Sequence, residues 1–157
     1  MNFVTDRNLM DISVAKDFIS KIHSFGFDSL TELEKAQWNA GLKGFLNYSD
    51  LNRIESNTAE IASLISVVIE EVKTDWSMTD IPTISDFQRI LNNVGKIRSS
   101  PWHNSNTPDI PSFPVNTYSK INDIEKILLD AYTVFTRYTD SISYIGEIYI
   151  DEEIGEL

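Results

Sequence analysis

The side chains that most often carry out chemistry in enzymes are scarce in this sequence. It contains no cysteine, and its two histidines, His23 and His103, lie far apart in the chain. A zinc site or a histidine-based triad needs several such groups together, and no phosphate-binding loop or nucleophile elbow is present either. An enzymatic role would require the fold to bring His103 beside a carboxylate such as Asp109. The sequence therefore predicts a protein that is not an enzyme, with no catalytic, cofactor-binding or metal-binding residues.

Composition narrows the classes of partner. The 157 residues suffice for one domain with a real core, and 41% of them are hydrophobic. The 24 acidic and 13 basic side chains give a formal charge of −11. Such a field repels nucleic acid and anionic lipid, so we expect neither nucleic acid nor membrane as a partner. The start of the chain resembles no signal peptide, and no apolar run approaches the ~20 residues that cross a bilayer. Synthesis in a cytoplasm follows as an expectation.

The elements that would position any site are helices. Apolar residues recur at steps of three and four along most of the chain, which predicts an all-α bundle of about four to five helices. Thr31 and Glu34 form a capping-box pattern at the start of a short helix. A solenoid of similar helices stacked side by side is the alternative, and we expect an antiparallel or mixed bundle. We expect a first helix from about Asp11 to Phe25, a second from Thr31 to the Gly41/Gly44 loop and a third from Ser49 to Val72. A fourth should start near Thr83 or Ser85 and end by Ser99, and a fifth should begin between Asn116 and Asn122 and reach Tyr138.

One pattern recurs three times, where helices are expected to start. A small polar residue precedes an aspartate, and a basic residue follows that aspartate three positions later. The small residue can cap the helix, the aspartate complements the helix dipole, and the basic residue can pair with the aspartate. Chance convergence on ordinary helix-start chemistry and a true structural repeat both explain the pattern. The residues concerned are Ser49, Asp50, Arg53, Ser85, Asp86, Arg89, Asn122, Asp123 and Lys126, with Gly41 and Gly44 in the loop before the first copy.

Two segments break the helical pattern. Residues 99–116 hold four of the five prolines and predict an extended connector within a bundle domain of residues 1–140. Residues 141–150 are rich in β-branched and aromatic side chains, which predicts a strand-like segment within a separate acidic C-terminal part, 141–157. This end either orders on a partner subunit by strand addition or is a frayed tail. Aromatic and proline residues in these segments either bind partners or pack onto the bundle; the partner-binding candidates are Trp76, Trp102, Pro111, Phe113, Tyr144, Ile148 and Tyr149.

Most of residues 5–130 resembles a known helical module. The similarity rests on Thr5-Asp6-Arg7, on Gly41-Leu42-Lys43-Gly44 and Asn47 to Glu55, on Thr74 to Thr83, and on Asn116-Thr117-Tyr118 with Asn122 to Glu125. The module occurs in minor structural proteins of the tails and baseplates of phages, prophages and phage-tail-like bacteriocin particles of Gram-positive bacteria. Its motifs carry no catalytic residue in that family.

The resemblance implies an assembly role. We expect a virion structural protein that links or decorates a tail tip, baseplate or tail fibre through protein–protein contacts, in several copies per particle. Its partners would be other tail, baseplate or fibre proteins. The alternative is a free-standing acidic binding protein, such as an immunity protein or inhibitor, which covers a basic partner; the charge of −11 motivates it.

Overall fold

The protein is helical throughout its ordered elements. The computed structural model describes the backbone of residues 1–151 and the side chains of residues 1–142. The described part contains five α-helices, one 3-10 turn and no strand, so the all-α prediction is confirmed for it. The elements are α1 (Leu9–Phe25), η1 (Phe27–Ser29), α2 (Glu32–Ala40), α3 (Tyr48–Leu64), α4 (Ile84–Arg98) and α5 (Tyr118–Asp151).

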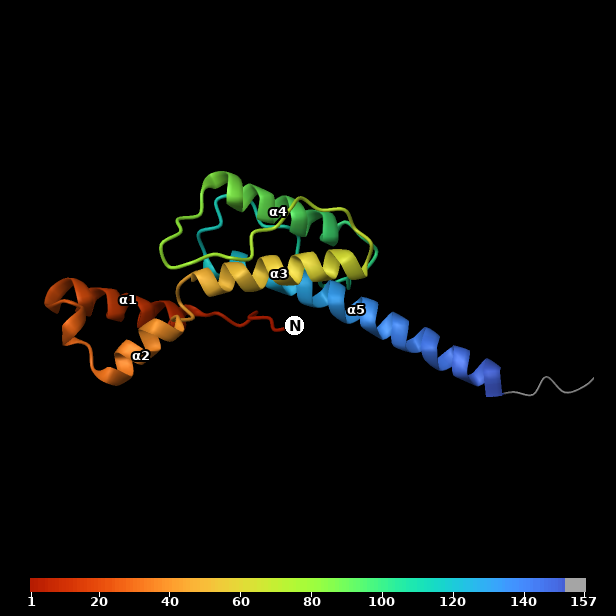
Figure 1. Cartoon of the computed structure of the whole chain (residues 1–157), viewed down its shortest axis with the longest axis horizontal. Coiled ribbons are helices and arrows are strands. Elements are labelled where there is room, and N and C mark those ends of the chain that lie inside the picture. Colours follow the sequence, from red (N-terminus) through yellow and green to blue (C-terminus); the bar gives the residue numbers. More distant parts are fainter. Residues whose placement is uncertain (152–157) are drawn as a thin grey trace, which may run out of the picture.

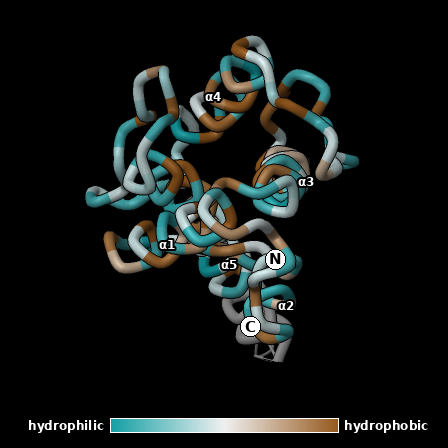
Figure 2. Tube along the Cα trace, turned by 90° about the vertical axis from the view of Figure 1, so that its left-hand side faces the viewer, coloured by the Kyte–Doolittle hydropathy of each residue, from teal (hydrophilic) through white to brown (hydrophobic). Residues whose placement is uncertain are grey.

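Helices α3, α4 and α5 form the bundle, and all three run in the same direction (Figure 1). The expectation of an antiparallel or mixed bundle was therefore wrong for these three helices. Parallel helices oblige the chain to travel back along the bundle after each one. Residues 65–83 and 99–117, the first and second return segments, lead the chain back along the bundle and contain no helix. Figure 2 looks along the bundle and places α4 above α3 and α5.

The core lies between these three helices. Each helix contributes apolar side chains at alternating steps of three and four, the spacing that keeps one helix face toward its neighbours. Trp76, from the first return segment, completes the core at 5% exposure. The buried helix residues are Leu51, Ile54 and Ile61 of α3, Ile90, Val94 and Ile97 of α4, and Ile121, Ile124, Ile127, Leu128 and Ala131 of α5.

Helix α3 is shorter than its apolar pattern predicts. It ends at Leu64, and Ser66 takes a positive φ of 57°, a conformation in which a non-glycine residue is uncommon. The apolar residues beyond this point belong to the return segment, where Val68 is 86% exposed. Residues 65–72, expected in the helix, therefore start the return journey instead.

The helix starts differ from the sequence prediction by a few residues. Asn47, rather than Ser49, precedes α3, and the Asp50 carboxylate accepts from the Asn47 backbone N–H (3.0 Å). Thr83, one of the two starts expected for α4, caps it by the same arrangement with Asp86, and Ser85 lies inside the helix. In both helices the acid lies three residues after the cap, where it can reach back to the cap's backbone. Asn122 lies inside α5, not at its start.

Helices α1 and α2 lie to one side of the bundle (Figure 1). They bury few large apolar residues, with Ala15 and Leu30 as their buried hydrophobic members. The capping box of Thr31 and Glu34 is confirmed, and Lys21 of α1 binds the Glu34 carboxylate of α2 (2.8 Å). The Trp38 ring of α2 lies edge-on to Phe27 and Phe45, with ring centroids 6.5 and 6.0 Å away, and the loop at Gly44 lies directly against α1.

Helix α5 continues far past the end of the bundle (Figure 1). The strand-like segment expected at residues 141–150 is not confirmed, since the backbone there is the last part of α5. The side chains of Tyr144, Ile148 and Tyr149 and the acidic residues 152–157 lie outside the described residues.

Candidate functional site

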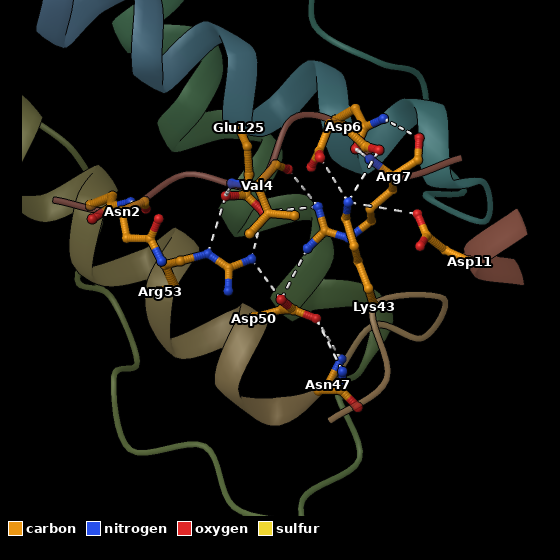
Figure 3. A network of polar contacts seen from close by, with 12 residues as sticks. Asn2, Val4, Asp6, Arg7, Asp11, Lys43, Asn47, Asp50, Arg53 and Glu125 are labelled. Atoms are coloured by element: carbon orange, nitrogen blue, oxygen red, sulfur yellow. Dashed lines mark hydrogen bonds and ion pairs between the residues drawn. The ribbon is translucent and has the colours of Figure 1, made fainter. Parts of the chain in front are cut away.

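A buried cluster of four charged side chains lies between α3, α5 and the N-terminal segment (Figure 3). Glu125 of α5 has no exposed area, and Arg7 and Asp50 are also buried. Arg7 binds Glu125 and Asp50, each at 3.0 Å, and Arg53 binds the same two carboxylates at 2.7 and 2.6 Å. Two positive and two negative groups leave the cluster neutral, which is what burial of charge requires.

The same cluster holds residues 2–7 in an extended conformation along the groove between α3 and α5. The Val4 backbone N–H donates to Glu125 (2.7 Å). The Asn122 amide accepts from the Arg7 backbone N–H (3.2 Å) and donates to the Arg7 carbonyl (2.8 Å). Asn57 of α3 donates to the carbonyl of Asn2 (2.7 Å). A segment without secondary structure thus has its backbone groups satisfied by side chains.

A second buried carboxylate, Glu55 of α3, lies between α3 and α4. At 1% exposure it accepts from both guanidinium nitrogens of Arg89 (2.7 and 2.9 Å) and from the Trp76 indole (2.9 Å). It also accepts from the Lys73 backbone N–H (3.0 Å). Glu55 therefore lies in the interior and not on the outer face of the helix, and four donors compensate its burial.

Glu55 works with two asparagines to hold the first return segment. The Asn52 amide accepts from the Trp76 backbone N–H (2.8 Å) and donates to the Trp76 carbonyl (2.9 Å). Asn93 of α4 bonds the N–H and carbonyl of Glu70 in the same way (2.8 and 3.0 Å). Residues 70–76 are therefore fixed along the groove between α3 and α4.

The two grooves use one arrangement twice. In each, an asparagine and a glutamate three residues later, in the pattern Asn-x-Ile-Glu, bind two backbone positions three residues apart. Asn52 and Glu55 bind residues 76 and 73, whereas Asn122 and Glu125 bind residues 7 and 4. An arginine of a neighbouring helix neutralises the glutamate: Arg89 of α4 pairs with Glu55, and Arg53 of α3 pairs with Glu125. Three parallel helices with segments in the grooves between them favour a structural repeat over chance.

The third groove, between α4 and α5, lacks this arrangement. Where the pattern would fall on α4 the sequence has Gln88-Arg89-Ile90-Leu91, without the glutamate. The second return segment is held instead by Asp130, which accepts from the Thr107 hydroxyl (2.7 Å). Arg98 adds bonds to the carbonyls of Thr107 (3.2 Å) and Pro108 (2.8 Å). Fewer backbone groups of this segment are bound by side chains of the helices.

The residues expected at helix starts therefore have wider roles. Asp50 and Asp86 pair with Arg53 and Arg89, as their spacing predicts, and both arginines reach a second helix as well. Burial lowers the pKa of Arg53, but its contacts with Glu125 and Asp50 outweigh this, and the net shift is upward.

The third copy of the pattern behaves differently. Lys126 pairs with Asp130, one turn further along α5, and not with Asp123. Burial raises the pKa of Asp123. The aspartate of this copy thus forms no i,i+3 pair.

The two glycines before the first copy also have distinct roles. Gly41 ends α2 at a positive φ of 87°, which favours glycine. Gly44 lies against the backbone of α1, where a Cβ atom would come within 2.1 Å of the Asp11 carbonyl oxygen. The loop thus needs glycine at one position for conformation and at the other for space.

The aromatic partner candidates mostly pack within the chain. Trp76 is buried, so its assignment as a partner-binding residue was wrong. Trp102 lies edge-on to Phe135 and Tyr138 of α5, with ring centroids 5.1 Å away in both cases. Pro111 is half-buried, and Phe113 remains exposed.

His103 and Asp109 line the same open hollow beside α4, but each is bonded to another group. His103 bonds the carbonyl of Ser100 through Nδ1 (2.7 Å), and Asp109 pairs with Arg98 (3.5 Å), so the histidine and this carboxylate have separate partners. Within residues 1–142 no group of three or more histidine and carboxylate side chains is placed to hold a metal ion. The buried carboxylates Glu55 and Glu125 are surrounded by donors of the chain itself. Their chemistry is to hold segments in place.

Sequence reasoning missed Arg7, Asn52, Glu55 and Glu125 as members of a site. The repeated Asn-x-Ile-Glu at 52–55 and 122–125 could have revealed Asn52, Glu55 and Glu125 but gives no sign of Arg7. It sets the register of the repeat better than Ser49 and Asn122 do. No family model, curated protein or solved structure matches this chain. In the part of the chain that the structure describes, no helix is long and apolar enough to cross a membrane.

Proposed function

We propose that this chain is a non-enzymatic structural component of a phage or phage-like tail, located in a baseplate or where a tail fibre attaches. It acts through contacts with other tail, baseplate or fibre proteins, and several copies enter each particle. The particle is assembled in the bacterial cytoplasm. The observation that carries the proposal is the use of the buried charges, which fix chain segments against a bundle from which α5 projects (Figure 1).

The residues behind the family resemblance support this role. Arg7, Asp50, Asn52, Glu55 and Trp76 belong to the stretches similar to the tail module, and each takes part in holding an extended segment. A motif kept for catalysis would place unpaired groups at an accessible position. An architectural motif places them in largely buried networks in which the charges pair with one another, as Arg7 and Asp50 do here. An architectural motif suits a protein whose work is to present rigid surfaces to neighbours.

The proposal is tested in intact particles. Tail particles purified from the bacterium that encodes this gene are analysed by quantitative mass spectrometry, with the tail tube protein as the internal reference. We expect the chain at a fixed ratio to the tube protein after repeated sedimentation. Particles from a strain with the gene deleted serve as the control and should lack the baseplate or fibre. Absence of the chain from intact particles refutes the proposal.

The net charge of −11 favours one alternative, an acidic protein that covers a basic partner. The two functions differ in salt dependence. A complex held by long-range attraction dissociates as ionic strength rises, whereas an assembly interface with an apolar centre resists salt. Release of the chain from particles by moderate salt would support the acidic binding protein over the assembly role.

A further inference from the structure

Helix α5 carries one unbroken apolar seam. Its members lie at steps of three and four from the first turn to Ile142, and the sequence continues the same spacing to Ile145 and Tyr149. A repeat of 3.5 residues is the spacing of coiled coils, in which the seam of one helix faces another helix along its whole length. The described members of this seam are Ile121, Ile124, Leu128, Ala131, Phe135, Tyr138 and Ile142.

Only the first half of the seam is covered. Ile121 to Ala131 are buried in the bundle core against α3 and α4, at 6% exposure or less. Helix α3 ends at Leu64 and α4 at Arg98, so neither accompanies α5 further. Trp102 packs on Phe135 and Tyr138, but Tyr138 is still 53% exposed and Ile142 is 51% exposed. The same face that packs in the core thus emerges uncovered.

We propose that a second copy of this chain covers the exposed half of the seam, its α5 packed against α5 of the first copy. The charge distribution favours this occupant. Although the chain carries −11 overall, residues 134–150 contain only Arg137, Asp140 and Glu147 as charged residues. The positions beside the seam, such as Val134 and Ser141, are uncharged, so pairing along the seam brings few like charges of two acidic chains together.

The bundle decides the orientation of the pair. Helices α3 and α4 occupy the seam face of α5 as far as Ala131. In a parallel pair, α3 and α4 of each copy would clash with those of the other copy in front of the two seams. In an antiparallel pair, the second helix enters where α3 and α4 end, and the two bundles lie at opposite ends. Residues 135–149 then overlap over about 21 Å, from the 1.5 Å rise per residue, with Ile142 at the centre. This pairing does not depend on a role in a tail.

Molar mass in solution tests the pairing. Light scattering of the full chain after size exclusion should give about twice the chain mass of 17.9 kDa at high concentration. Ile142→Asn should give the single-chain mass. Asp140→Asn creates the same residue two positions earlier, outside the seam, and should keep the pair. Both sites are exposed, so both variants should keep the wild-type circular dichroism spectrum. A single-chain mass for the wild type at every concentration, or a pair unaffected by Ile142→Asn, overturns the proposal.

Cysteine cross-linking tests the orientation, because the natural chain contains no cysteine. Ile142→Cys, at the centre of the overlap, should oxidise to a covalent pair, and Asp140→Cys should not. In the antiparallel arrangement two copies of residue 135 lie about 21 Å apart along the axis, far beyond disulfide reach. Phe135→Cys should therefore remain uncross-linked. Efficient cross-linking of Phe135→Cys overturns the antiparallel pair.

Discussion

Replacing Glu125 by glutamine should destabilise this protein strongly. The carboxylate has no exposed area and accepts four hydrogen bonds, from Val4, from Arg7 and twice from Arg53. Glutamine has nearly the same shape, but its NH₂ group would face donors, and no charge would remain on it. Asp50 alone would then balance two buried guanidinium groups.

The size of the effect follows from the burial of the cluster. Breaking a buried ion pair by removing one partner costs about 3–5 kcal/mol, because an uncompensated charge is left inside. With a urea dependence of about 2 kcal/mol per molar, this corresponds to a midpoint lower by about 2 M. Urea unfolding followed by circular dichroism at 222 nm measures it. The matched control is Glu60→Gln on the exposed face of α3, for which we expect a change within about 0.5 kcal/mol.

A double-mutant cycle separates charge balance from simple loss of contacts. In the double variant Arg7→Gln with Glu125→Gln, Arg53 and Asp50 remain as one balanced pair. Its destabilisation should be smaller than the sum of the two single variants by at least about 1 kcal/mol. Additive single effects, or a loss below about 1 kcal/mol for Glu125→Gln alone, would refute the view that this cluster holds the N-terminal segment through mutually compensating charges.

Two further predictions concern the α1–α2 side of the molecule. Gly44→Ala should reduce the free energy of unfolding by about 1–3 kcal/mol and so lower the melting temperature, because its Cβ would lie 2.1 Å from the Asp11 carbonyl oxygen. Gly95→Ala in α4, whose Cβ meets nothing nearer than 4.0 Å, should leave it equal or higher; an unchanged Gly44→Ala contradicts the close approach. The hydrogen bond from Lys21 is the main interaction that lowers the pKa of Glu34 to about 2. The stability that the Glu34 carboxylate contributes to the fold is therefore complete above the ordinary pKa of 4.5 and is lost as pH falls through about 2. A carboxyl NMR titration should give this low pKa for Glu34 and a value nearer the ordinary one in Lys21→Met; an ordinary pKa in the natural chain contradicts the contact.

The helices themselves were predictable because local chemistry specifies them. The capping boxes at Thr31 of α2 and at Thr83 of α4 follow from side chains three residues apart. The end of α3 was not predictable in this way. Ile65 to Val72 continue the apolar pattern of the helix. The turn occurs at Ser66, which adopts a positive φ although it is not the glycine that usually marks such a helix end. Apolar residues serve equally in a helix face and in an extended segment that lies in a groove, so spacing alone could not separate the two.

The buried clusters were missed for a different reason. Glutamate and arginine are usually exposed, so Glu55 and Glu125 were natural residues to assign to an outer face. Their burial depends on partners that are distant in sequence, such as Arg7, which lies 118 positions before Glu125. The local sequence contained one usable sign, the repeated Asn-x-Ile-Glu. Its meaning needs a backbone segment opposite each copy, and only the three-dimensional structure supplies that.

The parallel arrangement explains both the clusters and the projecting helix. A parallel bundle forces the chain back along its own length after α3 and again after α4, and each return leaves backbone groups that no helix satisfies. The asparagine and glutamate side chains satisfy them, at Trp76 and Lys73 in the first return. After α5 no further helix of the described chain follows, so no return limits its length. Helix α5 can therefore extend past its neighbours with its apolar seam intact, and the surface most suited to association is a direct consequence of the topology.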